Sequence, residues 1–135
     1  EGTILIDSTL TEMKNHGVEN FTVMHEVFHQ VLHKDCFRRS NPDYTHSTTR
    51  KALAGKRYPL SSLEICEYQA NTCAAAFLMP AAVIEEQLHY HHIDYILNFD
   101  NRRILIEMAG RFNVTKTAMK YRLINLGYAR PEIWR

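Results

Sequence analysis

The chain has 135 residues, 45% of them hydrophobic, and a formal net charge of +1 at pH 7, which predicts one domain with one core. No apolar run approaches the roughly 18 residues that a membrane span needs, and no signal peptide is recognisable. Cys36, Cys66 and Cys73 are odd in number and lack C-x-x-C spacing, which fits reduced thiols in a cytoplasmic protein. The chain begins at Glu1 without a methionine, as an excised portion of a longer protein would.

The charges are unevenly distributed along the chain. Residues 1–99 carry eight Lys or Arg against twelve Asp or Glu, whereas residues 100–135 carry eight against three. We therefore expect a core formed by residues 1–99 and a helical extension formed by residues 100–135, packed on the same domain.

The first predicted elements are short. The apolar, partly β-branched run over residues 3–6 predicts a strand. A helix over about residues 9–16 should follow, capped by Ser8 or Thr9 and ended by Gly17. The run over residues 3–6 would supply a strand of a small β-sheet in an otherwise helical chain.

The next predicted helix, over residues 20–34 with Asn20 as N-cap, contains the motif His25-Glu26-x-x-His29. Residues four apart lie on one helix face, so the imidazoles of His25 and His29 can bind one cation. Glu26 would sit beside the metal, where a base is needed to take a proton from water. Apolar residues recur with helical spacing at Phe21, Met24, Phe28 and Val31.

Residues 35–59 are polar and rich in turn-forming residues, and show no helical or strand periodicity. Two interpretations stay open for this segment: a surface loop, or a wall facing the substrate beside the metal. In the second interpretation, a side chain of this wall would donate a hydrogen bond to a developing oxyanion. The candidates are Tyr44, His46 and Tyr58.

Two helices are predicted after this segment. Ser61-x-x-Glu64 has capping-box spacing and starts a helix over about residues 62–78, which stops before Pro80. A helix over about residues 81–91 follows Pro80. The histidines near its end fit the negative end of the helix dipole better than a metal site; they are His89, His91 and His92.

The basic C-terminal part predicts two further helices, over about residues 103–112 and 116–126, with Thr115 as N-cap of the second. This pair resembles a helix-turn-helix. We favour an extension that braces the core or recognises a substrate protein. One alternative is a solvated face with no partner. The other is nucleic-acid binding through residues 103–130, with positive charge supplied by Lys116, Lys120, Arg122 and Arg130.

A zinc site in a hydrolase usually has three protein ligands, and three residues compete for the third place. His33 lies two turns from His25, about 12 Å along the helix, which is too far for all three histidines to meet one ion. Asp35 has the spacing of a metzincin ligand, but Leu32 stands where that motif needs glycine. Glu67 has Asn71 one turn later, able to hydrogen-bond the far nitrogen of a ligating histidine. Spacing alone does not separate Glu67 as a ligand from Glu67 as a solvated residue.

Four blocks of sequence, in order over most of residues 3–128, resemble the ImmA/IrrE family of metallopeptidases. The first is the motif helix ending in His33, and the second is Glu67-x-Gln-Ala-Asn-x-x-Ala-Ala-x-Phe-Leu-Met-Pro80. The third and fourth are Ala109-x-Arg-Phe-x-Val-Thr115 and Arg122-Leu-x-x-Leu-Gly127. Phe28 departs from the family pattern, which often has glycine before the second histidine.

The resemblance implies a compact, mostly helical, zincin-like α+β domain. It implies Zn²⁺ held by His25, His29 and Glu67, with Glu26 as the catalytic base. It also implies cleavage of a protein substrate, a DNA-binding repressor of a mobile element or stress response. The competing function is a DNA-binding regulatory module with a non-catalytic metal site, which would bind DNA even after chelation.

Overall fold

A computed structural model describes residues 3–11, 16–34, 61–93 and 102–130. Within these ranges the protein is helical, and the small β-sheet that we predicted has no strand among them. No helix in the described ranges has both the length and the apolar character needed to cross a membrane. The helices are α1 (Ser8–Thr11), α2 (His16–Leu32), α4 (Ser62–Leu78), α5 (Ala81–Tyr90), α6 (Arg102–Arg111) and α7 (Lys116–Asn125).

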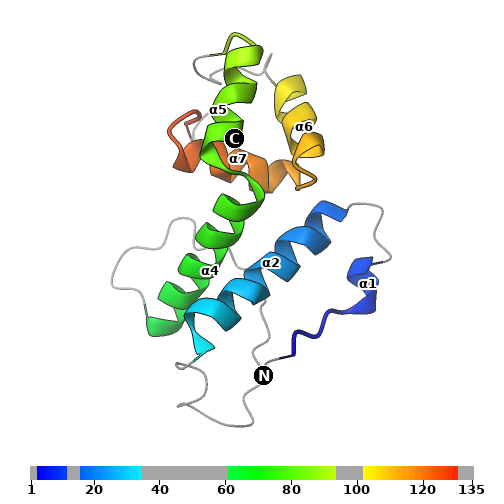
Figure 1. Ribbon diagram of the computed structural model, residues 1–135, viewed down its shortest axis with the longest axis vertical. Helices are drawn as coiled ribbons and strands as arrows, with labels where there is room; N and C mark the ends of the chain where they lie inside the picture. Colours follow the sequence, from blue (N-terminus) through cyan, green and yellow to red (C-terminus); the bar gives the residue numbers. More distant parts are fainter. Residues whose placement is uncertain (1–2, 12–15, 35–60, 94–101, 131–135) are drawn as a thin grey trace.

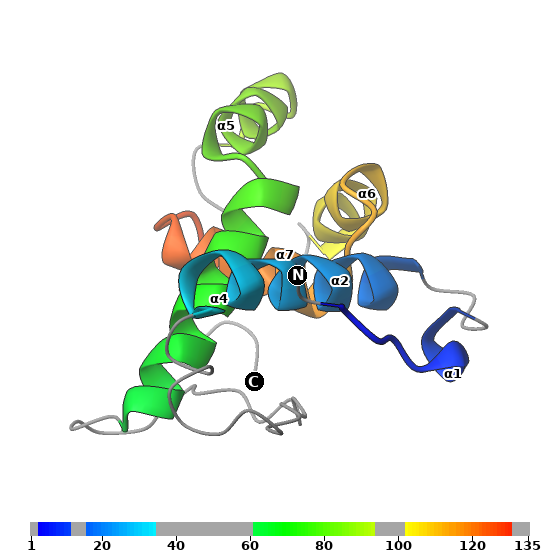
Figure 2. The same cartoon turned by 60° about the horizontal axis from the view of Figure 1, so that its bottom comes forward.

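The helices form two groups that share α4 (Figure 1). At one end α2 packs across α4, and at the other α5, α6 and α7 lie around the end of α4. The turned view shows α2 in front of α7, with α1 beyond the first turns of α2 (Figure 2). Helix α4 therefore connects the motif helix to the C-terminal helices.

The main hydrophobic core lies where α5, α6 and α7 meet the end of α4. Its side chains come from both sides of residue 100, so residues 1–99 and 100–135 both contribute to it. The largest side chains that are fully buried there are Met79, Ile84, Met108, Met119 and Leu123. Burial of side chains of this size contributes about 1.5–3 kcal/mol each.

Local sequence signals predicted the last four helices closely. The capping box at the start of α4 is present: Ser61 Oγ accepts from Glu64 N, and Glu64 Oε2 accepts from Ser61 N at 2.9 Å. Thr115 Oγ1 accepts from Ala118 N at 3.0 Å and caps α7. These predictions are confirmed because a capping residue and the amide it satisfies are only three positions apart.

The first elements differ from the prediction. Residues 3–7 belong to no helix or strand, and Leu5 is 88% exposed. Helix α1 spans Ser8–Thr11, and residues 12–15 of the predicted helix lie outside the described residues. Its capping residue is Asp7, whose Oδ1 accepts from Thr9 N at 2.9 Å, instead of Ser8 or Thr9. The hydrogen bonds from Thr9 lower the pKa of Asp7 because they favour its charged form.

The predictions for the start of the motif helix were wrong. Helix α2 begins at His16, so Gly17 lies in its first turn instead of ending an earlier helix. Asn20 lies inside α2 and is therefore not its N-cap; its Nδ2 donates to the main-chain oxygen of Asn113 at 3.1 Å. Both residues serve to dock α2 on the turn between α6 and α7.

Candidate metal centre

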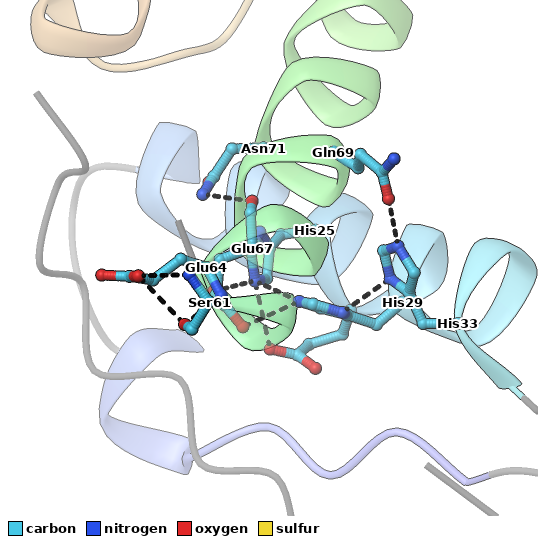
Figure 3. A network of polar contacts seen from close by, with 9 residues as sticks. His25, His29, His33, Ser61, Glu64, Glu67, Gln69 and Asn71 are labelled. Carbon is cyan, nitrogen blue, oxygen red and sulfur yellow. Dashed lines mark hydrogen bonds and ion pairs between the residues drawn. The ribbon is translucent and has the colours of Figure 1, made fainter. Parts of the chain in front are cut away.

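The two motif histidines lie side by side on α2 and face Glu67 of α4 (Figure 3). The Nε2 atoms of His25 and His29 are 3.0 Å apart. Glu67 Oε2 is 3.4 Å from His25 Nε2, and Glu67 Oε1 is 3.2 Å from His29 Nε2. His25 and His29 are each 4% exposed, whereas the side chain of Glu67 is 21% exposed.

The spacing of these three donors fits a small divalent cation. Zinc bonds of about 2.0–2.1 Å in a tetrahedron place ligand atoms about 3.3 Å from one another. The two imidazole nitrogens are 3.0 Å apart, and each has one Glu67 oxygen nearby, Oε2 at 3.4 Å from His25 and Oε1 at 3.2 Å from His29, distances close to that edge. The donor types, two nitrogens and one carboxylate oxygen, are those of hydrolytic zinc sites with an open fourth position.

Packing between α2 and α4 brings the donors together. Ala70 and Ala74 lie on the same face of α4 as Glu67 and are completely buried, and such small side chains allow closely spaced helix axes. Phe28, the residue at which the family pattern often has glycine, forms an edge-to-face contact with Phe77 of α4, with ring centroids 6.2 Å apart. The bulky ring at position 28 therefore contributes to the interface between the two helices.

Glu26 lies at the margin of the donor group. Its Oε1 is 4.0 Å from His25 Nε2, farther than Glu67 Oε2 at 3.4 Å, and its side chain is partly exposed. Glu67 rather than Glu26 thus completes the three-donor group, and Glu26 can meet solvent beside it. This is the placement expected from its position one residue after His25.

A second layer of contacts lies behind His29. Its Nδ1 is 3.1 Å from His33 Nδ1, and His33 Nε2 is 2.9 Å from Gln69 Oε1 on α4 (Figure 3). His33 is 3% exposed, which agrees with the expectation that it is packed rather than a third ligand. Gln69 was not among the functional residues that the sequence predicted. The contact between His29 and His33 could be expected, because these residues are four apart, as the two motif histidines are.

The hydrogen bond of Asn71 differs from the one that we expected. Its Nδ2 donates to the main-chain oxygen of Glu67 at 2.8 Å, within α4, rather than to a ligating imidazole. Asn side chains on helices commonly bond a carbonyl four residues earlier when they face solvent. Asn71 therefore contacts the site through the backbone of Glu67.

Other residues considered in the sequence analysis lie either outside the described residues or apart from this group. Asp35, the competing ligand, and Tyr44, His46 and Tyr58, the oxyanion candidates, lie outside the described residues, as does Cys36. Cys66 and Cys73 form no disulfide with each other. The histidines near the end of α5 do not enter a metal-binding group in the described ranges; His91 Nε2 lies 3.7 Å from Glu107 Oε1 of α6 instead.

The predicted C-terminal pair forms as α6 and α7, which pack on each other. One of its predicted phosphate-binding cations has an internal role: Arg122 Nε donates to the main-chain oxygen of Met79 at 3.0 Å. This bond joins α7 to the end of α4. Lys116 and Arg130 are exposed.

A helical domain with two histidines and a glutamate converging from two helices, and a further glutamate next to the first histidine, has the donor set of a metallopeptidase of the H-E-x-x-H class. The family model for the IrrE N-terminal-like domain, peptidase family M78, matches residues 3–124, and the chain belongs to this family. No curated protein and no solved structure matches the chain.

Proposed function

We propose that the protein is a zinc-dependent endopeptidase that hydrolyses peptide bonds. The observation that carries this proposal is the convergence of His25, His29 and Glu67 with spacing suited to one small cation. Membership of a metallopeptidase family supports it independently. In this proposal the two imidazoles and the Glu67 carboxylate hold Zn²⁺. Asn71 does not bind the metal but stabilises the backbone of Glu67 through its hydrogen bond to the main-chain oxygen.

Zinc, when bound, supplies a Lewis acid that polarises the scissile carbonyl and makes water more acidic. Glu26 takes a proton from the attacking water and delivers it to the leaving amine, so it acts first as base and then as acid. Its partly exposed carboxylate, beside His25 rather than between the two imidazoles, suits both transfers. His25 and His29 are buried, which keeps most water away from their imidazoles.

For the substrate we propose a DNA-binding repressor of a mobile element or of a stress response, on the strength of the resemblance to the ImmA/IrrE family. The C-terminal helices α6 and α7 then brace the catalytic helix, because their connecting turn contacts its first turns through Asn113 and Asn20. A DNA-binding role of the same helices is the competing proposal, supported by the exposed Lys116 and Arg130.

The proposal is tested by Glu26→Gln. This change keeps the size of the side chain but removes its basicity, so zinc content should be unchanged while proteolysis falls by about 10²-fold or more. Elemental analysis gives the zinc content, and proteolysis is assayed on candidate repressors from the gene's surroundings. The control is Glu19→Gln on the same helix, where Glu19 pairs with His16 at 3.3 Å, away from the donor group.

Full proteolysis by Glu26→Gln would exclude Glu26 as the base. A shift assay with DNA, with and without chelator, tests the competing role. Salt-sensitive DNA binding that survives chelation, in a chain without proteolysis, would favour the regulatory module over the enzyme.

A further inference from the structure

The chain of side chains behind His29 ends on an atom that cannot donate a hydrogen bond. Gln69 faces His33 with its amide oxygen, 2.9 Å from His33 Nε2. A carbonyl oxygen only accepts, so the hydrogen of this bond is on His33 Nε2. A neutral His33 then carries a lone pair on its other nitrogen, Nδ1.

That lone pair decides which nitrogen of His29 carries hydrogen. His33 Nδ1 is 3.1 Å from His29 Nδ1, and one of these two nitrogens must donate. Because His33 Nδ1 is the acceptor, His29 Nδ1 is the donor. A neutral His29 therefore carries its lone pair on Nε2, the atom that lies 3.0 Å from His25 Nε2 and 3.2 Å from Glu67 Oε1.

The carboxylate in front of His29 favours the opposite arrangement in the metal-free site. Glu67 Oε1 lies 3.2 Å from His29 Nε2 and can only accept, so by itself it would draw the hydrogen to Nε2. A metal ligand needs the lone pair at that position. The contacts from His33 and Gln69 favour hydrogen on His29 Nδ1, whereas Glu67 favours hydrogen on Nε2.

We propose that His33 and Gln69 are positioning residues, which hold His29 in the tautomer that presents Nε2 to the metal. This inference rests on the proposed zinc site. The arrangement takes the place of the carboxylate or main-chain carbonyl that usually accepts the outer hydrogen of a ligating histidine. The amide oxygen of Gln69, which determines the direction of these hydrogen bonds, comes from α4, the helix that also carries Glu67. Packing of α4 on α2 therefore places Glu67 beside the histidines and fixes the tautomer of His29.

A matched pair of variants at residue 33 tests the proposal. The Oδ1 atom of His33→Asn can occupy the place of Nδ1 and accept from His29, whereas His33→Leu has a similar size and accepts nothing. Zinc affinity is measured by competition with a coloured chelator. It should fall about 10- to 100-fold in His33→Leu, the usual effect of losing such a partner, and stay closer to that of the unaltered chain in His33→Asn.

The tautomer itself is read from imidazole ¹⁵N chemical shifts of the metal-free protein, at a pH where the rings are neutral. His29 should carry its hydrogen on Nδ1 in the unaltered chain and in His33→Asn, and on Nε2 in His33→Leu. A loss of packing alone would not move the hydrogen between the two nitrogens. Gln69→Met, on an exposed position that tolerates change, should also shift His29 toward Nε2–H and weaken zinc binding.

Equal zinc affinity of His33→Asn and His33→Leu would overturn the inference and leave the proposed enzyme intact. The same holds if His29 keeps its hydrogen on Nδ1 in His33→Leu and Gln69→Met. Failure of the unaltered chain to bind zinc would overturn the proposed function and, with it, this inference.

Discussion

A Cβ atom placed on Gly17 would lie 2.5 Å from the main-chain carbonyl carbon of Val114 and 2.8 Å from the nitrogen of Thr115. Both contacts are with backbone, which cannot move aside as the end of a side chain can. The first turn of α2 therefore rests directly on the turn between α6 and α7. Glycine is required at this position by the close approach of two segments that are far apart in the sequence.

We predict that Gly17→Ala destabilises the fold by about 1–3 kcal/mol, the usual cost of forcing an extra carbon into a packed contact. Chemical denaturation followed by circular dichroism measures the loss. The control is Gly110→Ala in α6, where an added Cβ meets nothing within 4 Å. That change should stabilise the protein by about 0.4–1 kcal/mol, because alanine favours helix more than glycine does. Equal stability of the two variants would contradict the close contact.

The sequence predicted the helices whose ends depend on neighbouring residues and mispredicted those that depend on distant ones. Ser61 and Thr115 satisfy amides three positions away, so their pattern is complete within one turn. Gly17 and Asn20 have the composition of a helix stop and an N-cap, yet their partners are the backbones of Val114 and Asn113. Nothing near Gly17 in the sequence carries that information.

The capping box at Ser61 gives a second prediction. Ser61→Ala removes the acceptor for Glu64 N and should cost about 1 kcal/mol of folding free energy. Ser62→Ala is the control, since Ser62 is an exposed residue at the first position of α4, and its effect should stay within about 0.5 kcal/mol. Urea denaturation of both variants separates the two; a Ser61→Ala protein as stable as Ser62→Ala would contradict a stabilising cap.

Arg122 gives a third prediction, because its guanidinium joins two helices. Met79 is completely buried, and Arg122 Nε donates to its main-chain oxygen. Arg122→Met keeps much of the apolar side chain but leaves that carbonyl without this donor, which should cost about 1–3 kcal/mol. Lys116→Met, on an exposed position of the same helix, is the control and should change little. An unchanged urea midpoint for Arg122→Met would show that the bond contributes nothing to stability.

The site was partly predictable for the same physical reason. The spacing of His25 and His29 places both imidazoles on one face of any helix, so the pair could be predicted without a tertiary structure. The third donor depends on where α4 crosses α2, and spacing left Glu67, Asp35 and a solvated role for Glu67 open. The crossing also brings Gln69 to His33, a contact between helices that no spacing rule describes.

The fourth prediction concerns metal removal and the role of Glu67. A cation that binds only the folded chain stabilises it by about 2.7 kcal/mol at a free concentration 100 times its dissociation constant, and a chelator should abolish this gain. In Glu67→Gln the gain should largely vanish, because an uncharged amide replaces the carboxylate that lies within 3.4 Å of His25 and 3.2 Å of His29. Glu86→Gln, on an exposed position of α5, should keep the full gain. Thermal denaturation with zinc and with chelator measures each difference. A gain in Glu67→Gln equal to that of the unaltered chain would remove Glu67 from the ligands and return Asp35 as the candidate for the third.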